Sequence, residues 1–433
     1  MHIVILALLL VSCGEGGGHA LPDALDAVDT ADTTADGTDG EDIPGEEPVC
    51  PDHDGDGHTS IECGGDDCDD GDPDVHPGAH DGPSIVDSSV VRDLTGGHDI
   101  AIDPSGTVHV VYLRGAGELW HATLDSGTWD AETIGESGYA PSMAIDSAGR
   151  VAVVYTGSVP SPGRGVRLAT NATGAWTMGW VQSMPLDDPY YPEIALASDG
   201  MPHVVYGVTF DYPGNLVYTT FTSGAWAPEY VSDRGVVVCS PAGIALDGGV
   251  VHVAYPGQDN EAVHAVRGTG GWTTEVAAGG EVGSAFVAVD SAVHIAYSIH
   301  STVDAEESLR YATDESGSWT DVSIDEDVVW VDDYGCGDRT VGWALDASGI
   351  PHAAFHDDGI QALRYATIVS GAWRSYTIDS SGDTGWLPAL VLAGGLAHML
   401  HLDWATGDLL YVAVTVPDGV DDDCDTEIDE DSP

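Results

Sequence analysis

Two acidic stretches at opposite ends of the chain have the residue types and the spacing to bind a metal ion. The first, residues 50–81, contains Asp52, Asp54 and Asp56 at alternating positions, with a glycine directly after them. Carboxylates at the first, third and fifth positions of a loop can converge on a calcium ion, and the glycine allows the sharp turn that follows. The second stretch, residues 418–430, also alternates acidic residues. Both stretches therefore predict a site for a hard cation.

The candidate ligands of this site all offer oxygen atoms. In the first stretch, position seven would contribute the carbonyl of His58 and position nine the hydroxyl of Ser60, whereas position twelve is Cys63 in place of the usual glutamate. An all-oxygen set favours calcium over copper. A solvated acidic linker and a copper site are the two alternatives. The candidate ligands are Asp52, Asp54, Asp56, His58, Ser60, Asp69, Asp70, Asp72, Asp421, Asp423, Asp425 and Asp429.

Taken together, the two stretches resemble the MopE-type metal-binding repeat of secreted bacterial proteins. That repeat joins a DxDGDG stretch to DCDD, then PGA, and ends in a cysteine-flanked acidic segment, and this chain has the corresponding residues 52–57, 67–70 and 77–79. It departs from the repeat at Thr426, where a glycine is expected, and at Pro417, where a cysteine is expected. The resemblance implies one small metal-binding module, built from 50–83 and 417–433 and interrupted by residues 84–416.

The N-terminal residues predict export and a lipid anchor. The apolar run 3–11 is too short to span a bilayer and is typical of a signal peptide, which we place at residues 1–12. Leu10-Val-Ser-Cys13 resembles a bacterial lipobox, which implies lipidation of Cys13; an ordinary signal peptide is the alternative. Residues 13–49 are acidic and lack aromatic side chains, so we expect a disordered tether. The expected location is the bacterial outer membrane, facing the outside or the periplasm.

Charge and cysteine content limit the partners. The net charge of -62, with only eleven basic residues, excludes nucleic acid and anionic lipid surfaces, because both require a basic patch. We expect a monomer whose ligand is a glycan or a protein. Apart from Cys13, an exported chain should pair its remaining cysteines. The expected bridges are Cys68–Cys424 with Cys50–Cys63, one of three possible pairings of these four, and Cys239–Cys336.

Residues 84–416 repeat a pattern typical of a β-propeller. Each copy has a short strand ending in Asp, a glycine turn, a His-Val-x-Tyr strand, a third strand, and a turn followed by Trp. Four short strands per unit, at a period of roughly 42 to 58 residues, favour propeller blades. The last unit lacks a fourth strand, and 85–91 precedes the first unit as an extra strand. We therefore expect an all-β, seven-bladed propeller that its N-terminal strand closes, with both acidic stretches on the same face.

Most recurring side chains predict structural roles. The repeated histidines should bond the backbone of a neighbouring blade, the repeated aspartates should form β-turns, and the tryptophans should pack in the core. These sets are His109, His203, His252, His294, His352 and His398; Asp103, Asp146, Asp247, Asp290 and Asp346; and Trp129, Trp176, Trp226, Trp272, Trp319 and Trp373.

The long connections predict a ligand-binding face opposite the short turns, because variable loops on a rigid scaffold usually carry binding residues. The candidates are Tyr190, Tyr191, Phe210, Tyr212, Trp330, Asp332, Asp333, Tyr334 and Arg339. The function expected from these features is a surface-anchored, calcium-binding propeller lipoprotein that binds a ligand through this face. A metal-scavenging protein is a further alternative.

A secreted sialidase-like glycosidase or a polysaccharide lyase on the same propeller is the catalytic alternative. The Ser-Gly-x-Trp turns partly resemble the Asp-boxes of sialidases, which are structural. A sialidase-like site also needs an arginine cluster. Three arginines occupy repeated or turn positions, and four others lie near the loops: Arg150, Arg310 and Arg364, and Arg164, Arg167, Arg234 and Arg339. No catalytic set emerges from this pattern, so the sequence favours binding over catalysis.

Overall fold

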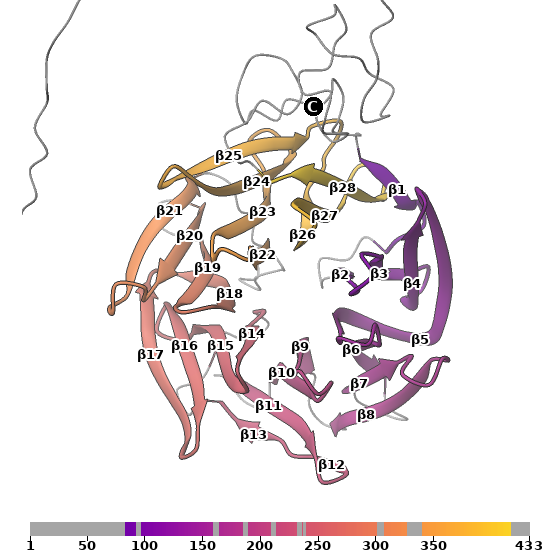
Figure 1. Ribbon diagram of the computed structural model, residues 1–433, viewed down its shortest axis with the longest axis horizontal. Coiled ribbons are helices and arrows are strands. Elements are labelled where there is room, and N and C mark those ends of the chain that lie inside the picture. Colours follow the sequence, from indigo (N-terminus) through magenta and orange to yellow (C-terminus); the bar gives the residue numbers. More distant parts are fainter. Residues whose placement is uncertain are drawn as a thin grey trace, which may run out of the picture. The chain divides into compact units, whose positions relative to one another are not determined.

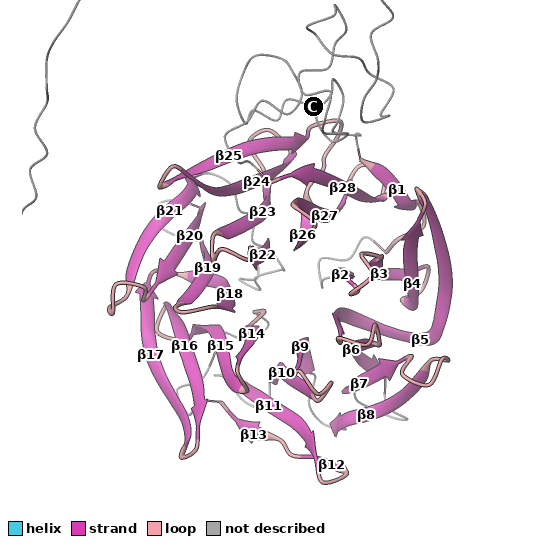
Figure 2. Cartoon of the chain, viewed as in Figure 1, coloured by secondary structure: helices cyan, strands magenta, loops and turns pink. Residues whose placement is uncertain are grey.

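The computed structural model describes residues 83–91, 97–158, 164–184, 189–208, 214–231, 236, 240–300, 307–326 and 340–416. The chain divides into two units, Met1–Val49 and Cys50–Pro433, and all described residues belong to the second unit. Within them the secondary structure consists of strands joined by turns and loops, with no helix (Figure 2). The sheets stand around a common centre, as in a propeller (Figure 1). The prediction of an all-β propeller is therefore confirmed.

Five sheets have the size of single blades. In strand order, the first sheet contains β1 (Ser84–Asp87), β28 (Leu409–Thr415), β27 (Leu396–Leu402) and β26 (Trp386–Ala393), and the second contains β12 (Ala225–Trp226), β11 (Asn215–Thr222), β10 (Pro202–Val208) and β9 (Pro189–Leu196), with β13 (Glu229–Tyr230) also paired to β11. The third contains β14 (Gly243–Asp247), β15 (Val250–Gly257), β16 (Glu261–Gly268) and β17 (Gly271–Gly279), and the fourth contains β18 (Val282–Val289), β19 (Val293–His300), β20 (Glu307–Thr313) and β21 (Thr320–Glu326). The fifth contains β22 (Val341–Leu345), β23 (Pro351–Asp357), β24 (Ala362–Val369) and β25 (Ala372–Asp379).

The sixth sheet is larger and changes the expected count of blades. It contains seven strands, namely β2 (His98–Ile102), β3 (Val108–Arg114), β4 (Glu118–Asp125), β5 (Thr128–Ile145), β6 (Val151–Ser158), β7 (Arg164–Thr170) and β8 (Thr177–Met184). The 18-residue β5 pairs with β4 through its first part and with β6 through its second part. The prediction of seven separate blades is therefore wrong. Backbone hydrogen bonds join two four-stranded units into one sheet, because β5 passes from one unit into the next without a break. Five blades are separate.

The first and last described strands are paired. β1 runs antiparallel to β28, with Ser84 opposite Tyr411 and Ile85 opposite Leu410, and the two lie side by side in Figure 1. The sheet that contains β26 and β27 thus takes its outer strand from the N-terminal side of the described chain, as expected. This pairing connects residues more than three hundred positions apart, since the Ser84 hydroxyl bonds the Tyr411 carbonyl across 327 residues.

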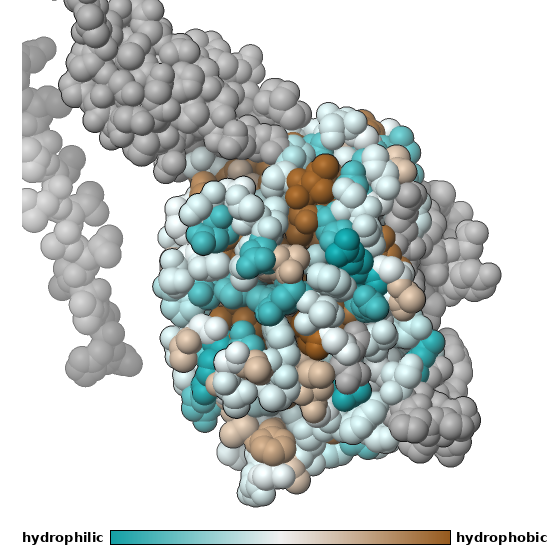
Figure 3. Space-filling view, turned by 90° about the vertical axis from the view of Figure 1, so that its right-hand side faces the viewer, coloured by the Kyte–Doolittle hydropathy of each residue, from teal (hydrophilic) through white to brown (hydrophobic). Residues whose placement is uncertain are grey.

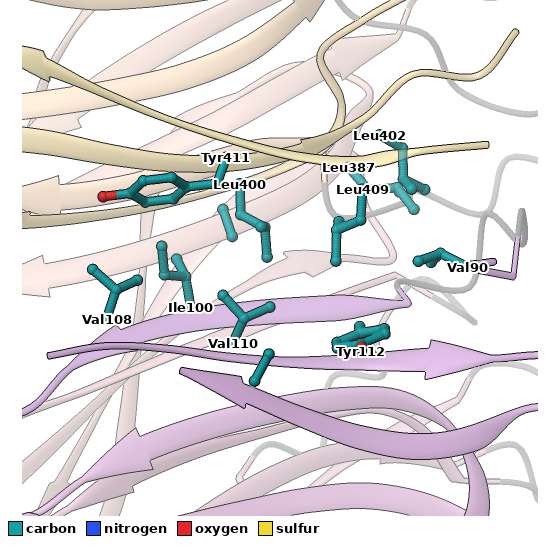
Figure 4. Packing of buried hydrophobic residues seen from close by; sticks show 12 residues of the cluster. Val90, Ile100, Val108, Val110, Tyr112, Leu387, Leu400, Leu402, Leu409 and Tyr411 are labelled. Atoms are coloured by element: carbon teal, nitrogen blue, oxygen red, sulfur yellow. The ribbon is translucent and has the colours of Figure 1, made fainter. Parts of the chain in front are cut away.

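Hydrophobic packing distinguishes more units in the ring than the hydrogen-bonded sheets do. In the described part of the chain, seven hydrophobic clusters lie between neighbouring four-stranded units. One of them, which includes Val111, Leu119 and Val153, separates the two halves of the seven-stranded sheet. Figure 4 shows another, in which Val108 and Val110 face Leu400. Each fully buried side chain of this size contributes roughly 1.5–3 kcal/mol, so these clusters are the main source of stability.

The ring has two ends, which differ in their connections. The inner strands finish at short turns rich in Asp and Gly, and we call that end the turn face. The inner strands begin at the other end, which we call the loop face. The side of the molecule seen in Figure 3 is mostly hydrophilic with small separate hydrophobic patches. Met178 and Trp180 are each 37% exposed.

Candidate functional site

The inner strands line a central cavity of about 170 Å³. Its polar side chains lie on one side of the ring, where β2, β5 and β9 supply Asp99, Ser142 and Glu193. The other strands contribute mainly apolar or small residues, including Phe286 and Ala389. The cavity is therefore polar on one wall and apolar on the other.

The two carboxylates of this cavity hold neighbouring inner strands together. Asp99 accepts hydrogen bonds from the backbone N–H groups of Ile100 (2.9 Å) and Met143 (2.7 Å). Glu193 accepts one from the Ser142 hydroxyl at 2.9 Å. A carboxylate engaged in this way has a structural role.

Glycines keep the apolar wall tight. A Cβ on Gly342 would lie 2.7 Å from the Leu390 backbone nitrogen, and one on Gly243 would lie 2.7 Å from the Phe286 Cα. No side chain fits at such distances, so these positions allow adjacent inner strands to approach closely. The cavity is narrow for this reason.

An aromatic cluster occupies the loop face beside this cavity. The His356 ring stacks on Trp386 with 4.4 Å between ring centroids, and Trp386 lies 5.1 Å from Trp404. Both tryptophans are half-buried. Trp386 is two residues before Pro388, which lines the central cavity. Because a strand rises about 3.3 Å per residue, the cluster lies close to the loop-face end of the cavity.

Hydrogen bonds fix this cluster in place. The Trp386 indole donates to Asp383 (2.7 Å), and the backbone N–H of Trp404 donates to the Asp383 carbonyl (2.7 Å). The His356 ring bonds the Thr384 carbonyl at 2.6 Å. The β25–β26 connection is thus tied to the β27–β28 turn. A rigid aromatic surface with a carboxylate at its side can bind a ligand at a low entropic cost.

A buried histidine–aspartate pair supports the cluster from below. His401 Nδ1 accepts a hydrogen bond from the Gly385 N–H (3.1 Å), and His401 Nε2 lies 3.6 Å from Asp379 Oδ2. Both side chains are almost completely buried. Burial lowers the pKa of His401 to about 4, although Asp379 and Asp403 act to raise it. The ring is therefore neutral at pH 7, and its role is structural.

The recurring histidines are also structural, but their partners differ from the prediction. Each bonds a Tyr or His ring on the next strand of its own sheet, and not the backbone of a neighbouring blade. The pairs are His109–His121 (3.0 Å), His203–Tyr218 (2.6 Å), His252–His264 (3.0 Å), His294–Tyr311 (2.6 Å), His352–Tyr365 (2.6 Å) and His398–Tyr411 (2.7 Å). The reason is register, because the two rings lie on the same side of adjacent strands.

The recurring tryptophans complete these pairs from the following unit. Edge-on ring contacts join Trp129 to Tyr411, Trp176 to His121, Trp272 to Tyr218, Trp319 to His264 and Trp373 to Tyr311, with centroids 5.2–5.6 Å apart. The prediction that the recurring tryptophans pack in the core is confirmed for all six, because each, Trp226 included, packs against a hydrophobic cluster. Such aromatic pairs contribute about 0.5–1.5 kcal/mol each beyond the area that they bury.

The aspartates before the turn glycines form β-turns, as predicted. Asp103 accepts hydrogen bonds from the N–H groups of Ser105 (2.8 Å) and Thr107 (2.9 Å). Burial raises its pKa, but these bonds and the Ser105 hydroxyl lower it more, to about 2. Gly106 has a φ of 88°, which an L side chain rarely adopts.

The described arginines considered for catalysis contact residues of their own sheets, and Arg364 also lies 3.6 Å from Asp325 of the neighbouring sheet. The contacts are Arg150 with Asp146, Arg310 with Asp321, Arg364 with Asp357, Arg164 over the Tyr139 ring and Arg167 over the Trp180 ring. Arg234 and Arg339 lie outside the described residues. The described part of the chain thus contains no arginine cluster of the sialidase type.

Most sequence-predicted site residues also lie outside the described residues. This holds for Phe210, Tyr212, Trp330, Asp332, Asp333, Tyr334 and Arg339, for every candidate metal ligand, and for all seven cysteines. Tyr190 belongs to β9 and is half-buried. Tyr191 is only 9% exposed, so the prediction that it is an exposed loop aromatic is wrong. Strand β9 begins at Pro189, and Tyr191 lies in a β-bulge of that strand with a φ of 40°, where its side chain is buried.

Sequence reasoning missed the loop-face cluster. Trp386 and Trp404 do not occupy the repeated tryptophan position, and that departure from the repeat was a readable signal. The sequence did not show that these two tryptophans lie close together, because their distance depends on how the β25–β26 connection and the β27–β28 turn meet.

Two negative findings apply to the described ranges. They contain no group of three or more His, Cys, Asp or Glu side chains that could hold a metal ion. Across the same ranges, a helix long and apolar enough to cross a membrane was not found.

No protein-family model and no curated protein matches this chain. Solved structures do. The fucose-specific lectin from Aleuria aurantia is 14% identical, with a TM-score of 0.46, over 69% of this chain and 99% of the lectin. A polysaccharide lyase of family PL25, an ulvan lyase, is 13% identical, with a TM-score of 0.49, over 78% of this chain and 95% of the lyase. These likenesses concern the arrangement of strands and carry no information about a ligand of this chain.

Proposed function

We propose that this protein is a non-catalytic carbohydrate-binding module that binds its ligand at the loop face. The fixed cluster of His356, Trp386 and Trp404 is the observation that supports this proposal. A sugar ring presents C–H groups that pack on aromatic faces, and its hydroxyls donate hydrogen bonds to carboxylates. Asp383 stands beside the cluster, and Asp99 and Glu193 line the adjoining cavity. Sites of this kind combine apolar walls with a few placed polar groups.

Substitution of Trp404 tests the proposal. Trp404→Ala removes one ring from a turn and leaves the β26 strand and Trp386 in place. Binding to an array of bacterial and algal polysaccharides should fall at least tenfold, whereas Trp180→Ala, at an exposed ring on the outer strand β8, should leave it unchanged. Unaltered binding by the Trp404 variant would refute the loop-face site.

The catalytic alternative predicts turnover. A glycosidase or lyase should release sugar from the polysaccharide that it binds, and an Arg339 substitution should abolish that release. Binding without product supports the module proposed here. The arginine contacts within the sheets favour this outcome.

The proposal extends to the two acidic stretches and the N-terminus. A lipid on Cys13 anchors the protein in the bacterial envelope, residues 13–49 hold the propeller away from the membrane, and a calcium module with Cys68–Cys424 and Cys50–Cys63 bridges joins residues 50–83 to 417–433. The pairing of β1 with β28 supports this module, because residue 83 and residue 416 border those adjacent strands. A bridge across so long a loop would stabilise the fold by several kcal/mol.

Chelation tests the calcium part. A ligand bound only to the folded state raises the melting temperature, so EDTA should lower it and calcium should restore it. Melting curves that coincide with and without EDTA would refute the calcium module while leaving the carbohydrate proposal intact.

A further inference from the structure

One boundary between units lacks the pair of bonded rings, a histidine with a tyrosine or a second histidine, that is found at the others. In the unit of β6 and β7, Ala152 stands in the place of the repeated histidine. Leu168 takes the place of the ring that the histidine would bond, since Ala152 pairs with Thr170 as His203 pairs with Thr220 two residues beyond Tyr218. Two rings are thus replaced by a methyl group and an isobutyl group.

A pocket of about 410 Å³ opens at this boundary on the turn face. Its walls include Ala152 and Leu168, with Met201, Phe221 and Trp226 from the next unit. The Phe221 and Trp226 rings meet edge to face at 5.5 Å, and Phe221 is 39% exposed. An exposed phenylalanine packed on a half-buried tryptophan beside a hollow of this size is typical of a ligand site.

Trp226 carries an indole donor that two of its counterparts use internally, whereas the Trp129 and Trp373 indoles are buried without a hydrogen-bond partner among the described residues. The Trp176 indole donates to Glu132 (2.8 Å), and the Trp272 indole donates to Glu229 (2.9 Å). The repeat puts Gly179 where that acceptor for Trp226 should be. Among the described residues, the Trp226 indole has no hydrogen-bond acceptor, so it is available to a bound molecule.

Charged groups of both signs stand at the edge of the pocket. Arg150 Nη2 bonds Asp146 Oδ2 at 2.5 Å, and Asp199 is nearby. Gly200 allows this arrangement, because a Cβ there would lie 2.8 Å from Arg150 Nη2. Burial raises the pKa of Asp146, but its bonds to Arg150 outweigh that effect and lower it. The edge therefore offers both donors and acceptors at neutral pH.

We infer that this pocket is a second binding site, which takes a single neutral sugar ring. The aromatic and aliphatic walls suit the C–H face of such a ring, and the indole N–H, Arg150 and the two carboxylates suit its hydroxyls. An anionic ligand would face Asp146, Asp199 and the net charge of -62. A purely apolar group would leave the polar edge unused. The site lies at the opposite end of the strands from Trp404, so it does not depend on the loop-face proposal.

Filling the pocket is the decisive experiment. The Ala152→His/Leu168→Tyr double variant installs the pair that occupies other boundaries of the same ring. Methyl glycosides of neutral hexoses, pentoses and deoxyhexoses, and methyl glucuronide as an anionic probe, are titrated into the full chain and followed by saturation-transfer NMR and calorimetry. At least one neutral glycoside should bind the unaltered protein, and the double variant should bind it at least tenfold more weakly.

Further variants separate the possible results. Arg150→Ala, which alters only the exposed edge, should also weaken binding, and it tests the site if the double variant does not fold. Trp404→Ala should bind these glycosides as the unaltered protein does. The inference is overturned if no neutral glycoside binds, if only the glucuronide binds, if both pocket variants bind normally, or if Trp404→Ala abolishes the signal.

Discussion

The boundary between β2–β5 and β5–β8 differs sharply from the boundary between β5–β8 and β9–β13. In the first, His109, His121 and Trp176 form a continuous set of rings, and the tryptophan donates to Glu132. In the second, Ala152 and Leu168 leave Trp226 beside an open pocket. The strands that carry these residues are alike in length and pairing. One boundary of a repeated scaffold can therefore lack the packed aromatic rings, while the remaining boundaries keep the propeller stable.

Breaking a filled boundary should have the largest effect on stability. Tyr311 is 6% exposed, bonds His294 and packs on Trp373. Tyr311→Ala should lower the free energy of unfolding by about 3–5 kcal/mol, because it leaves a cavity and an unpaired histidine. Leu168→Ala, which enlarges an existing pocket, should cost about 1–2 kcal/mol. Urea denaturation measures both, and equal losses would remove the distinction between the boundaries.

Acid should weaken the filled boundaries through their histidines. His352 is fully buried against Tyr365, and burial lowers its pKa to about 4. Above pH 6.5 the ring is neutral in both states. As the pH falls from about 6.5 to 4, the unfolded chain takes up the proton first, so on the order of 2–3 kcal/mol of stability is lost. Melting temperatures across this range should show a smaller decline for His352→Gln, and parallel declines would contradict the assignment.

Filling the open boundary should stabilise the protein. The Ala152→His/Leu168→Tyr variant adds a buried hydrogen bond and an aromatic contact with Trp226, which together should raise the free energy of unfolding by about 1–2 kcal/mol. Ala152→His alone lacks the partner and should gain nothing. A destabilised double variant would mean that this boundary cannot accept the filling of the others.

Restoring only the missing acceptor should have the smallest effect. Gly179→Glu supplies the carboxylate that Trp226 lacks, and a Cβ at this exposed position meets no atom within 4 Å. The expected gain is about 0.5–1 kcal/mol in the free energy of unfolding, the usual contribution of one hydrogen bond. Gly179→Gln provides a neutral control for the added charge.

The repeat made the propeller readable, because one strand pattern recurs with a fixed spacing and each copy meets the same neighbours. The same pattern shows Ala152 in place of the repeated histidine and Leu168 in place of the ring on the next strand, although the sequence did not show that these two positions face each other. The blade count was less secure. Residues 135–138 resemble a turn between strands, yet β5 continues through them.

The sequence by itself determined the strands, the recurring rings and their structural purpose, since these follow from local periodicity repeated along the chain. Only the tertiary structure decided which ring each histidine bonds, that Tyr191 turns inward, and that Trp386 meets Trp404. The pocket at Trp226 belongs to the second group. It exists because residues from two units, about 50 to 75 positions apart, fail to fill a shared space, and such a vacancy is a property of packing and not of any single strand.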